Sequence, residues 1–381
     1  MKSFFYTLFL GWLSIGIHAQ TTLNLSLEHD GISRDYAVYI PDSYTGDDAV
    51  PLLFNFHGFG SNGFEQTFYG DFRSIADTAG FILIHPEGTL ISGSAHWNVG
   101  GFTAGSTTDD VGFTNAMIDT ISANYNINAE RIYSTGMSNG GYFSFRLACE
   151  LSNRIAAIAS VTGSMTPETL FACNPQHAMP MMQIHGTTDA VVPYDGGVLW
   201  SKSIEDVMTY WINFNNCDAA PQINEVPDIS PNDNCTADHF IYTNPDTEMT
   251  TEHFKIYDGG HTWPGAPFNF AGTNQDFNAS DEIWKFFSRY DINGFNPIIT
   301  TSTKELEINK LSVFPNPASS TIQVRGFVEK AMPYRILNST GQELKSGVLS
   351  GQDQIIDLSA LPADLYLLNT GFQSIKFMKI N

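Results

Sequence analysis

The sequence predicts an α/β domain with a mostly parallel sheet, followed by a small all-β sandwich domain. Short apolar runs typical of buried strands alternate with helical patterns as far as residue 290. Residues 291–305 have the composition of a linker. In residues 306–381 the pattern changes to short alternating strands separated by turn residues. A chain of 381 residues is long enough for one large and one small domain.

Residues 1–19 have the pattern of a secretory signal peptide. Lys2 supplies the positive charge, Phe4 to Ile17 the apolar middle, and Ala19 a small residue before the expected cut. No other run is long enough to cross a membrane as a helix. We therefore expect the protein to pass through the periplasm and to be secreted or held at the cell surface, with residues 20–290 as its main domain.

Four cysteines fit two disulfides in an oxidising compartment. We expect Cys149 to pair with Cys173 and Cys217 with Cys235, although four cysteines allow three pairings.

The formal net charge is −22, and nearly all of the excess acid lies before Lys304. Such a surface argues against nucleic acid and anionic membranes as partners and favours neutral polymers or small esters. A role of the acidic surface in solubility alone is an equally simple explanation.

In the first domain, the elements follow from local patterns in chain order. Residues 23–27 and 36–40 alternate in polarity, whereas 52–56 are apolar on both faces, as in a central strand. The elements expected after these are a helix over 66–79, a strand over 81–85, a polar loop over 86–107, a helix over 109–124, strands over 131–133, 155–162 and 180–185, a helix over 199–214, an irregular segment over 215–250, a strand over 254–257 and a helix over 280–290.

The clearest chemical signal is Gly136-Met137-Ser138-Asn139-Gly140, between a predicted strand and a predicted helix. In a sharp strand-to-helix turn the glycines relieve crowding, and the serine oxygen stands exposed at the start of the helix. Helix N–H groups nearby can stabilise negative charge. Ser138 is therefore the expected nucleophile.

Asp189 and His261 each follow a predicted strand. Asp189 lies in the turn after residues 180–185 and is favoured over Asp195, which is further from the strand end. His261 lies between paired glycines and a Trp-Pro pair. The order serine, aspartate, histidine is the one that α/β hydrolases use, so we expect a Ser138–His261–Asp189 triad.

The oxyanion formed during such catalysis needs backbone donors, which we expect from Phe59 and Asn139. Phe59 follows His57-Gly58 at the end of the buried strand, and we expect the His57 side chain to bond to backbone. Trp97 in the polar loop and Trp263 beside His261 are expected to contact substrate.

Several motifs together resemble the polyhydroxybutyrate depolymerase-type esterase family, which includes feruloyl and acetylxylan esterases. They are Phe56-His57-Gly58, Trp97, Asp109-Asp110-Val-Gly-Phe113, Gly136-Met-Ser-Asn-Gly-Gly141, His185-Gly-Thr-Thr-Asp189, Val192-Pro193-Tyr194 and Gly260-His261-Thr-Trp-Pro264. The resemblance spans about residues 30–290 and implies an α/β-hydrolase fold with the triad named above. The sequence departs from the family at Phe59, where members often carry cysteine.

The tail resembles the C-terminal sorting domain of type IX secretion. The resemblance rests on Val313-Phe-Pro-Asn-Pro317, Asn338-Ser-Thr-Gly341, residues 358–366 and the closing Lys-Ile-Asn. It implies the type IX machinery as a partner. A polymer-binding module is the alternative interpretation of this domain.

We thus expect a secreted serine carboxylic ester hydrolase that releases feruloyl or acetyl groups from plant polysaccharide. An extracellular polyhydroxybutyrate depolymerase is the alternative, and a non-catalytic polymer-binding protein on the same scaffold is the alternative of another class. A metal hydrolase using His57, His85, His96 and His185 is disfavoured, because no pair has metal-ligand spacing on one element. We expect neither a metal nor a cofactor.

Overall fold

The computed structural model describes residues 21–197, 199–267, 270–298, 311–338, 343–370 and 374–380. The expected signal peptide, residues 1–19, lies outside the described residues. The chain divides into two compact units, one up to Ile298 and one from Ile299 onward. Within the described residues, no helix is both long and apolar enough to span a bilayer.

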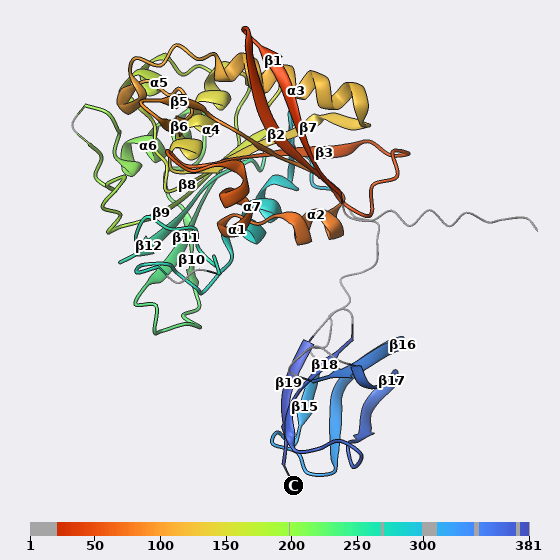
Figure 1. Cartoon of the computed structure of the whole chain (residues 1–381). Helices are drawn as coiled ribbons and strands as arrows, with labels where there is room; N and C mark the ends of the chain where they lie inside the picture. The colour runs from red at the N-terminus through yellow and green to blue at the C-terminus, as the bar shows by residue number, and fades with distance from the viewer. Residues whose placement is uncertain are drawn as a thin grey trace, which may run out of the picture. The chain divides into compact units, whose positions relative to one another are not determined.

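The first unit is built on one ten-stranded sheet (Figure 1), which confirms the predicted fold class. Six strands in the middle run parallel, and an antiparallel pair lies at each edge. The strands in sheet order are β1 (Thr21–His29), β2 (Ile32–Ile40), β4 (Ile82–Pro86), β3 (Val50–Phe56), β7 (Ile127–Met137), β8 (Ala157–Val161), β9 (Met181–Gly186), β12 (Thr250–Tyr257), β11 (Thr236–Thr243) and β10 (Gln222–Val226).

Helices cover both faces of this sheet, so the sheet contributes to two apolar cores. Strand β3 shows why: Leu52, Phe54 and Phe56 belong to one core and Leu53 to the other, because successive strand residues point to opposite faces. The helices are α1 (Gly63–Tyr69), α2 (Arg73–Ala79), the short 3-10 helix η1 (Gly101–Thr103), α3 (Asp110–Asn124), α4 (Asn139–Glu150), α5 (Pro167–Ala172), α6 (Ile204–Phe214) and α7 (Ala279–Phe287). A small hairpin, β5 (Thr89–Ile91) and β6 (Ser94–His96), lies apart from the main sheet.

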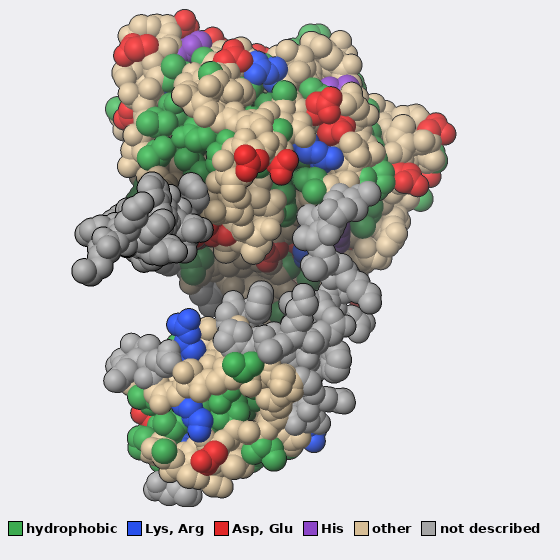
Figure 2. All heavy atoms as spheres, turned by 90° about the vertical axis from the view of Figure 1, so that its right-hand side faces the viewer, with side chains coloured by type: hydrophobic (Ala, Val, Ile, Leu, Met, Phe, Trp, Pro, Cys, Tyr) green, Lys and Arg blue, Asp and Glu red, His purple; other side chains and the backbone are tan. Residues whose placement is uncertain are grey.

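Acidic side chains are scattered over the surface of the first unit. Figure 2 shows several of them, with few basic side chains, on the face of that unit that it presents. The buried core contrasts with this surface, since the largest fully buried side chains are aromatic.

Several expected boundaries differ from the structure. The helix expected over 66–79 is the two helices α1 and α2, and the segment 215–250 contains strands β10 and β11. Residues 291–298, expected as linker, belong to the first unit: β13 (Tyr290–Asp291) pairs with β14 (Gly294–Phe295). The buried Arg131 explains this, because its guanidinium donates to the carbonyls of Tyr290 and Asn296. The rest of the expected linker, 299–305, lies outside the described residues.

One disulfide, Cys149–Cys173, is present as expected. The second expected bond is wrong, because Cys217 and Cys235 carry free thiols. Cys217 Sγ lies 3.7 Å from Thr251 Oγ1 at the start of β12, and Cys235 Sγ lies 3.7 Å from the Asp258 carbonyl just past its end. Seven residues of extended strand separate these points by about 23 Å, far beyond the reach of a disulfide.

The second unit is an all-β domain with antiparallel ladders, in agreement with the prediction. Its strands are β15 (Ser312–Phe314), β16 (Thr321–Leu337), β17 (Glu343–Asp357), β18 (Asp364–Asn369) and β19 (Ser374–Lys379). Two strands expected over 321–324 and 334–337 form the single strand β16, whose pairing with β17 shifts register between them. Ile322, Leu368 and Phe377 belong to its core.

Replacing Cys149 and Cys173 together by alanine should lower the free energy of unfolding by about 3 kcal/mol. The bond joins residues that are 24 positions apart and so restricts the unfolded chain. Urea unfolding of the oxidised protein measures this loss.

Thiol titration of the wild type in denaturant should give two thiols per chain, and Cys217→Ser with Cys235→Ser should reduce the count to none. A wild-type count of zero would contradict the free thiols.

Candidate active site

Ser138 occupies a strained turn between β7 and α4. Its backbone has φ 54° and ψ −118°, a conformation that residues with side chains rarely adopt. A Cβ atom on Gly140 would lie 2.1 Å from the Phe56 carbonyl oxygen, and one on Gly136 would lie 2.5 Å from the same atom. Only glycine fits at either position. The two glycines therefore allow the turn to lie against the end of β3.

Asp189 and His261 meet at the ends of neighbouring strands β9 and β12. The His261 Nδ1–H donates to Asp189 Oδ2 at 2.7 Å. The other carboxylate oxygen accepts the N–H groups of Val191 and Val192, both at 2.8 Å. Burial alone would raise the pKa of Asp189, but the hydrogen bond and charge of His261, with His185 and the Val192 N–H, lower it. The carboxylate thus stays ionised, and His261 Nε2 is left to act as a base.

Ser138 and His261 both line a cavity of about 420 Å³. Most of its wall is apolar; the lining residues are Gly58, Phe59, Ser61, Tyr69, Met137, Ser138, Val191, His261, Thr262, Trp263, Ala266, Phe270 and Thr273. In the described part of the chain, Ser138 Oγ makes no hydrogen bond to His261. The structure therefore brings Ser138 and His261 to one cavity, and Asp189 is hydrogen-bonded to His261, but Ser138 and His261 are not hydrogen-bonded to each other.

The loop after β3 presents the expected oxyanion donors. Across residues 21–298, within the described ranges, the N–H groups of Phe59 and Asn139 have no hydrogen-bond partner. His57 fixes this loop: its Nδ1–H donates to the Gly58 carbonyl at 2.7 Å and its Nε2 accepts the Gly88 N–H at 2.9 Å. Burial lowers the pKa of His57 to about 4, so the ring is neutral at neutral pH. Its side chain bonds to backbone, as expected.

Trp97 does not line the Ser138 cavity, so the structure does not support the expected contact with substrate. Its side chain is fully buried, stacks on Phe143 with centroids 5.3 Å apart, and donates from Nε1 to the His57 carbonyl at 3.0 Å. Its backbone N–H donates to Asn139 Oδ1 at 2.7 Å. Trp97 therefore braces the Phe59 loop and the Ser138 turn from inside the core.

Trp263 lines the cavity but is only 2% exposed. Its Nε1–H donates to Ser280 Oγ at 3.2 Å, which ties the ring to the start of α7. Trp263 thus forms part of the cavity floor.

A row of aromatic side chains beside the cavity was missed from the sequence. The Phe59 and Phe102 ring centroids lie 6.3 Å apart, and Phe102 lies 5.7 Å from Trp200. Phe59 and Phe102 are 45% and 38% exposed. Phe59 and Trp200 lie in different loops and Phe102 lies in η1, so the sequence carries no signal that they meet.

The four histidines of the disfavoured metal site do not converge. Among the described residues, the one group of three possible ligand side chains is His29, Asp30 and Asp109, and it contains none of the four. His96, for example, bonds through Nδ1 to the Thr89 carbonyl and through Nε2 to Ser106 Oγ.

Comparison with known proteins finds a match in each of the two units. Residues 45–226 match the phospholipase/carboxylesterase family model, and residues 312–380 match the model of the secretion system C-terminal sorting domain. The chain has an α/β-hydrolase fold and is similar over residues 45–226 to the phospholipase/carboxylesterase family. The resemblance to feruloyl and acetylxylan esterases that the sequence motifs indicated is confirmed by the relatives.

The relatives include a bifunctional acetylxylan esterase/xylanase of Neocallimastix patriciarum, 26% identical over 274 residues, which are 72% of this chain and 36% of that protein. Feruloyl esterase B of Piromyces equi is 29% identical over 238 residues, 60% of this chain and 42% of that protein. This chain therefore spans well under half of each. A probable feruloyl esterase C of Aspergillus niger is 27% identical over 267 residues, 68% of this chain and 85% of that protein.

Among solved structures, an acetyl xylan esterase from Aspergillus awamori superimposes with a TM-score of 0.52 at 14% identity. The match covers 70% of this chain and 98% of that one. At this identity the likeness supports the fold alone.

The protein should lose stability in mild acid, at pH values above those at which its carboxylates become protonated. Burial lowers the pKa of His57 and His253 to about 4 and of His85 to about 3, whereas in the unfolded chain each is about 6.5. Below pH 6.5 the unfolded chain binds protons that the folded chain does not, so stability is full above pH 6.5 and falls towards pH 4.

Urea unfolding between pH 7 and pH 4.5 measures this effect. The three histidines together should give a slope of up to about 4 kcal/mol per pH unit. His253→Gln should remove about one third of the slope. A wild-type free energy of unfolding that does not change between pH 6.5 and 4.5 would contradict the neutral burial of these rings.

Proposed function

We propose that this protein is a secreted serine esterase in which Ser138, His261 and Asp189 form the catalytic triad. Ser138 Oγ attacks the ester carbonyl while its proton passes to His261 Nε2, which returns it to the leaving alcohol. Water then hydrolyses the acyl-enzyme with His261 again as base. Asp189 holds the imidazole in the required tautomer and stabilises its charged form. The observation that carries the proposal is the partly buried Asp189–His261 hydrogen bond beside the cavity that Ser138 and His261 line.

Two features support the remaining steps. Catalytic hydrogen bonds are often long without substrate, so the open serine–histidine contact is compatible with the mechanism. The tetrahedral oxyanion would accept hydrogen bonds from the Phe59 and Asn139 N–H groups, each donor contributing about 3 kcal/mol.

The cavity favours a bulky aromatic acyl group over a small one. Its volume of about 420 Å³ is several times what an acetyl group needs, and Phe59, Trp263 and Phe270 give it aromatic walls. Tyr69 and Ser61, whose hydroxyls lie 3.2 Å apart, offer polar partners for a phenol. We therefore propose release of feruloyl groups, with acetyl groups as the smaller alternative, from plant polysaccharide.

The alcohol part of the substrate would lie outside the cavity. The row formed by Phe59, Phe102 and Trp200 begins at the cavity wall and offers apolar faces on which sugar rings can pack. A polyhydroxybutyrate depolymerase remains the second candidate, because the same apolar row would also suit a polyester chain.

Hydrolysis of methyl ferulate, acetylated xylan and a hydroxybutyrate oligomer, measured side by side, tests the substrate. We expect kcat/KM to be highest for the feruloyl ester. Ser138→Ala should lower it by at least about 10³-fold and abolish labelling by a fluorophosphonate, whereas Ser61→Ala should still be labelled. A folded wild type that takes up no label would point to the non-catalytic binding protein.

We also propose that the C-terminal domain directs export through the type IX machinery, which the match of residues 312–380 supports. Deleting residues 306–381 should leave esterase activity of the cytoplasmic protein unchanged, because the first unit has its own core. The same deletion should stop export, as measured by activity in the medium and at the cell surface. Export of the truncated protein at the wild-type level would refute this role.

A further inference from the structure

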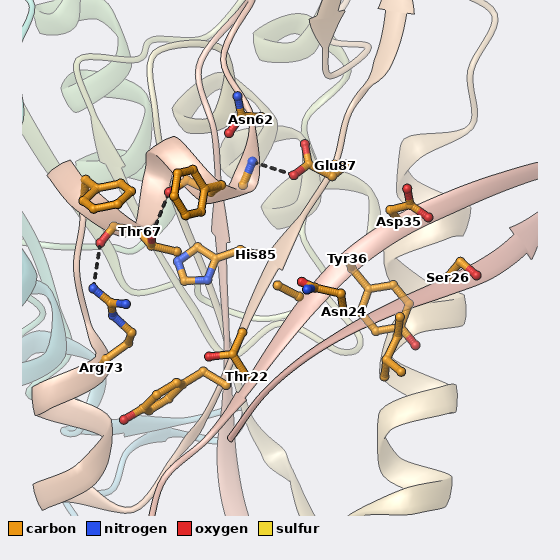
Figure 3. Close-up of a pocket in the computed structure, with 16 residues that line it drawn as sticks. Thr22, Asn24, Ser26, Asp35, Tyr36, Asn62, Thr67, Arg73, His85 and Glu87 are labelled. Carbon is orange, nitrogen blue, oxygen red and sulfur yellow. Dashed lines mark hydrogen bonds between the residues drawn. The ribbon is translucent and has the colours of Figure 1, made fainter. Parts of the chain in front are cut away.

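A second hollow, of about 790 Å³, lies between the β1–β2 hairpin and helix α1 (Figure 3). It shares no lining residue with the Ser138 cavity. Its lining combines polar and apolar surface and comprises Thr22, Asn24, Leu25, Ser26, Asp35, Tyr36, Ala37, Tyr39, Asn62, Gly63, Phe64, Thr67, Phe68, Arg73, His85 and Glu87.

One face of the hairpin is built for water or a polar ligand rather than for a core. Thr22, Asn24 and Ser26 alternate along β1 and are all exposed. They pair across to Tyr39, Ala37 and Asp35 on β2. These small polar side chains form the wall of the hollow opposite α1, as Figure 3 shows for Asn24 and Thr22.

His85 supplies a hydrogen-bond donor that opens on the hollow. It is 2% exposed, and Figure 3 places its ring between Thr67 of α1 and the hairpin. The Asn55 amide has a fixed orientation, because its Nδ2 donates to the Gly70 carbonyl at 2.8 Å and its Oδ1 accepts from Gln66 at 2.7 Å. Asn55 Nδ2 also lies 3.4 Å from His85 Nε2, which must therefore accept.

With Nε2 as acceptor, the neutral His85 ring carries its proton on Nδ1. Burial lowers the pKa of this ring to about 3, so it stays neutral at neutral pH. In the described part of the chain, Nδ1 has no hydrogen-bond partner. Nδ1 is not among the enclosed unpaired atoms of the described residues, so this donor is open to the hollow and available to a ligand oxygen.

The other polar groups suit a neutral ligand with many hydroxyls. Glu87 is held in place by the Gly63 N–H at 2.9 Å, and Asp35 is exposed on β2. The cation of the lining, Arg73, is paired with Asp71 at 2.8 Å. Two carboxylates without a free cation among the lining side chains disfavour an anion.

Phe64 and Phe68 add an apolar surface at the rim. They are 70% and 41% exposed, and their ring centroids lie 4.8 Å apart in an edge-to-face arrangement. Sugar rings combine an apolar C–H face with hydroxyl edges. Exposed aromatic rings next to amides, hydroxyls and carboxylates match both parts of such a ligand.

We propose that this hollow binds a neutral oligosaccharide segment of the polymer whose ester group reaches Ser138. The link to catalysis rests on the proposed esterase function. Helix α1 is seven residues, or about 10 Å, long; its last residue, Tyr69, and Ser61 before its start line the Ser138 cavity. One polymer chain can therefore occupy both sites. The hollow should increase affinity for polymeric substrates and not for small esters.

The first test measures binding of xylohexaose to the full chain carrying Ser138→Ala, by calorimetry. Binding is expected, and adding Phe64→Ala or Asn24→Ala should weaken it at least about 10-fold. Phe171→Ala is the matched control: this phenylalanine is 94% exposed on α5 and lines neither site, so binding should not change. The proposal is overturned by absence of binding, or by equal binding in all variants.

The second test separates this inference from the esterase proposal. In the active enzyme, Phe64→Ala should raise KM for acetylated xylan about 10-fold while kcat/KM for methyl ferulate stays unchanged. An equal loss on both substrates would overturn the separate site. Xylohexaose binding by a wild type that takes up no fluorophosphonate would leave the oligosaccharide site standing and overturn the esterase alone.

Discussion

The close contact between the end of β3 and the start of α4 is the constraint on which the rest of the site depends. The Phe56 carbonyl lies where a side chain on Gly136 or Gly140 would otherwise be. This contact brings Gly58 beside Ser138, since a Cβ on Gly58 would lie 3.5 Å from Ser138 Cβ. The close approach of these two backbone segments therefore fixes the position of the expected nucleophile relative to the expected oxyanion donors.

The buried side chains around this contact keep it rigid. Trp97 bonds to the His57 carbonyl on one side and to Asn139 on the other, and His57 holds Gly58. The negative charge of Asp189 is stabilised separately, because its carboxylate accepts hydrogen bonds from two backbone N–H groups and from His261. Packing thus sets the geometry on the serine side, and electrostatics sets it on the histidine side.

Local sequence patterns were sufficient for the central fold. The continuous apolar run of β3 and the glycines around Ser138 each report a short-range requirement, and these predictions agree with the structure. Strand-end positions were likewise sufficient to bring Asp189 and His261 together. Trp97 could not be placed in this way, because a tryptophan in a polar loop has the same local sequence whether it turns outward or into the core.

The other predictions failed because each depends on contacts between residues that are far apart in the sequence. Cys217 and Cys235 are close along the chain, but strand β12 separates them in space. Residues 291–298 have a linker-like composition, yet Arg131, on the distant strand β7, binds their carbonyls. The row of Phe59, Phe102 and Trp200 brings together three separate segments of the chain. No local sequence pattern predicts the conformations of these segments.

Residues 291–298 are part of the first unit, and this has a consequence for cleavage of the chain. Every carbonyl that Arg131 binds lies before residue 299. A protease that cuts the chain beyond Ile298 would therefore remove none of these bonds. Loss of the chain beyond Ile298 would thus leave Arg131 fully bonded, whereas loss of ten further residues would uncover its buried guanidinium.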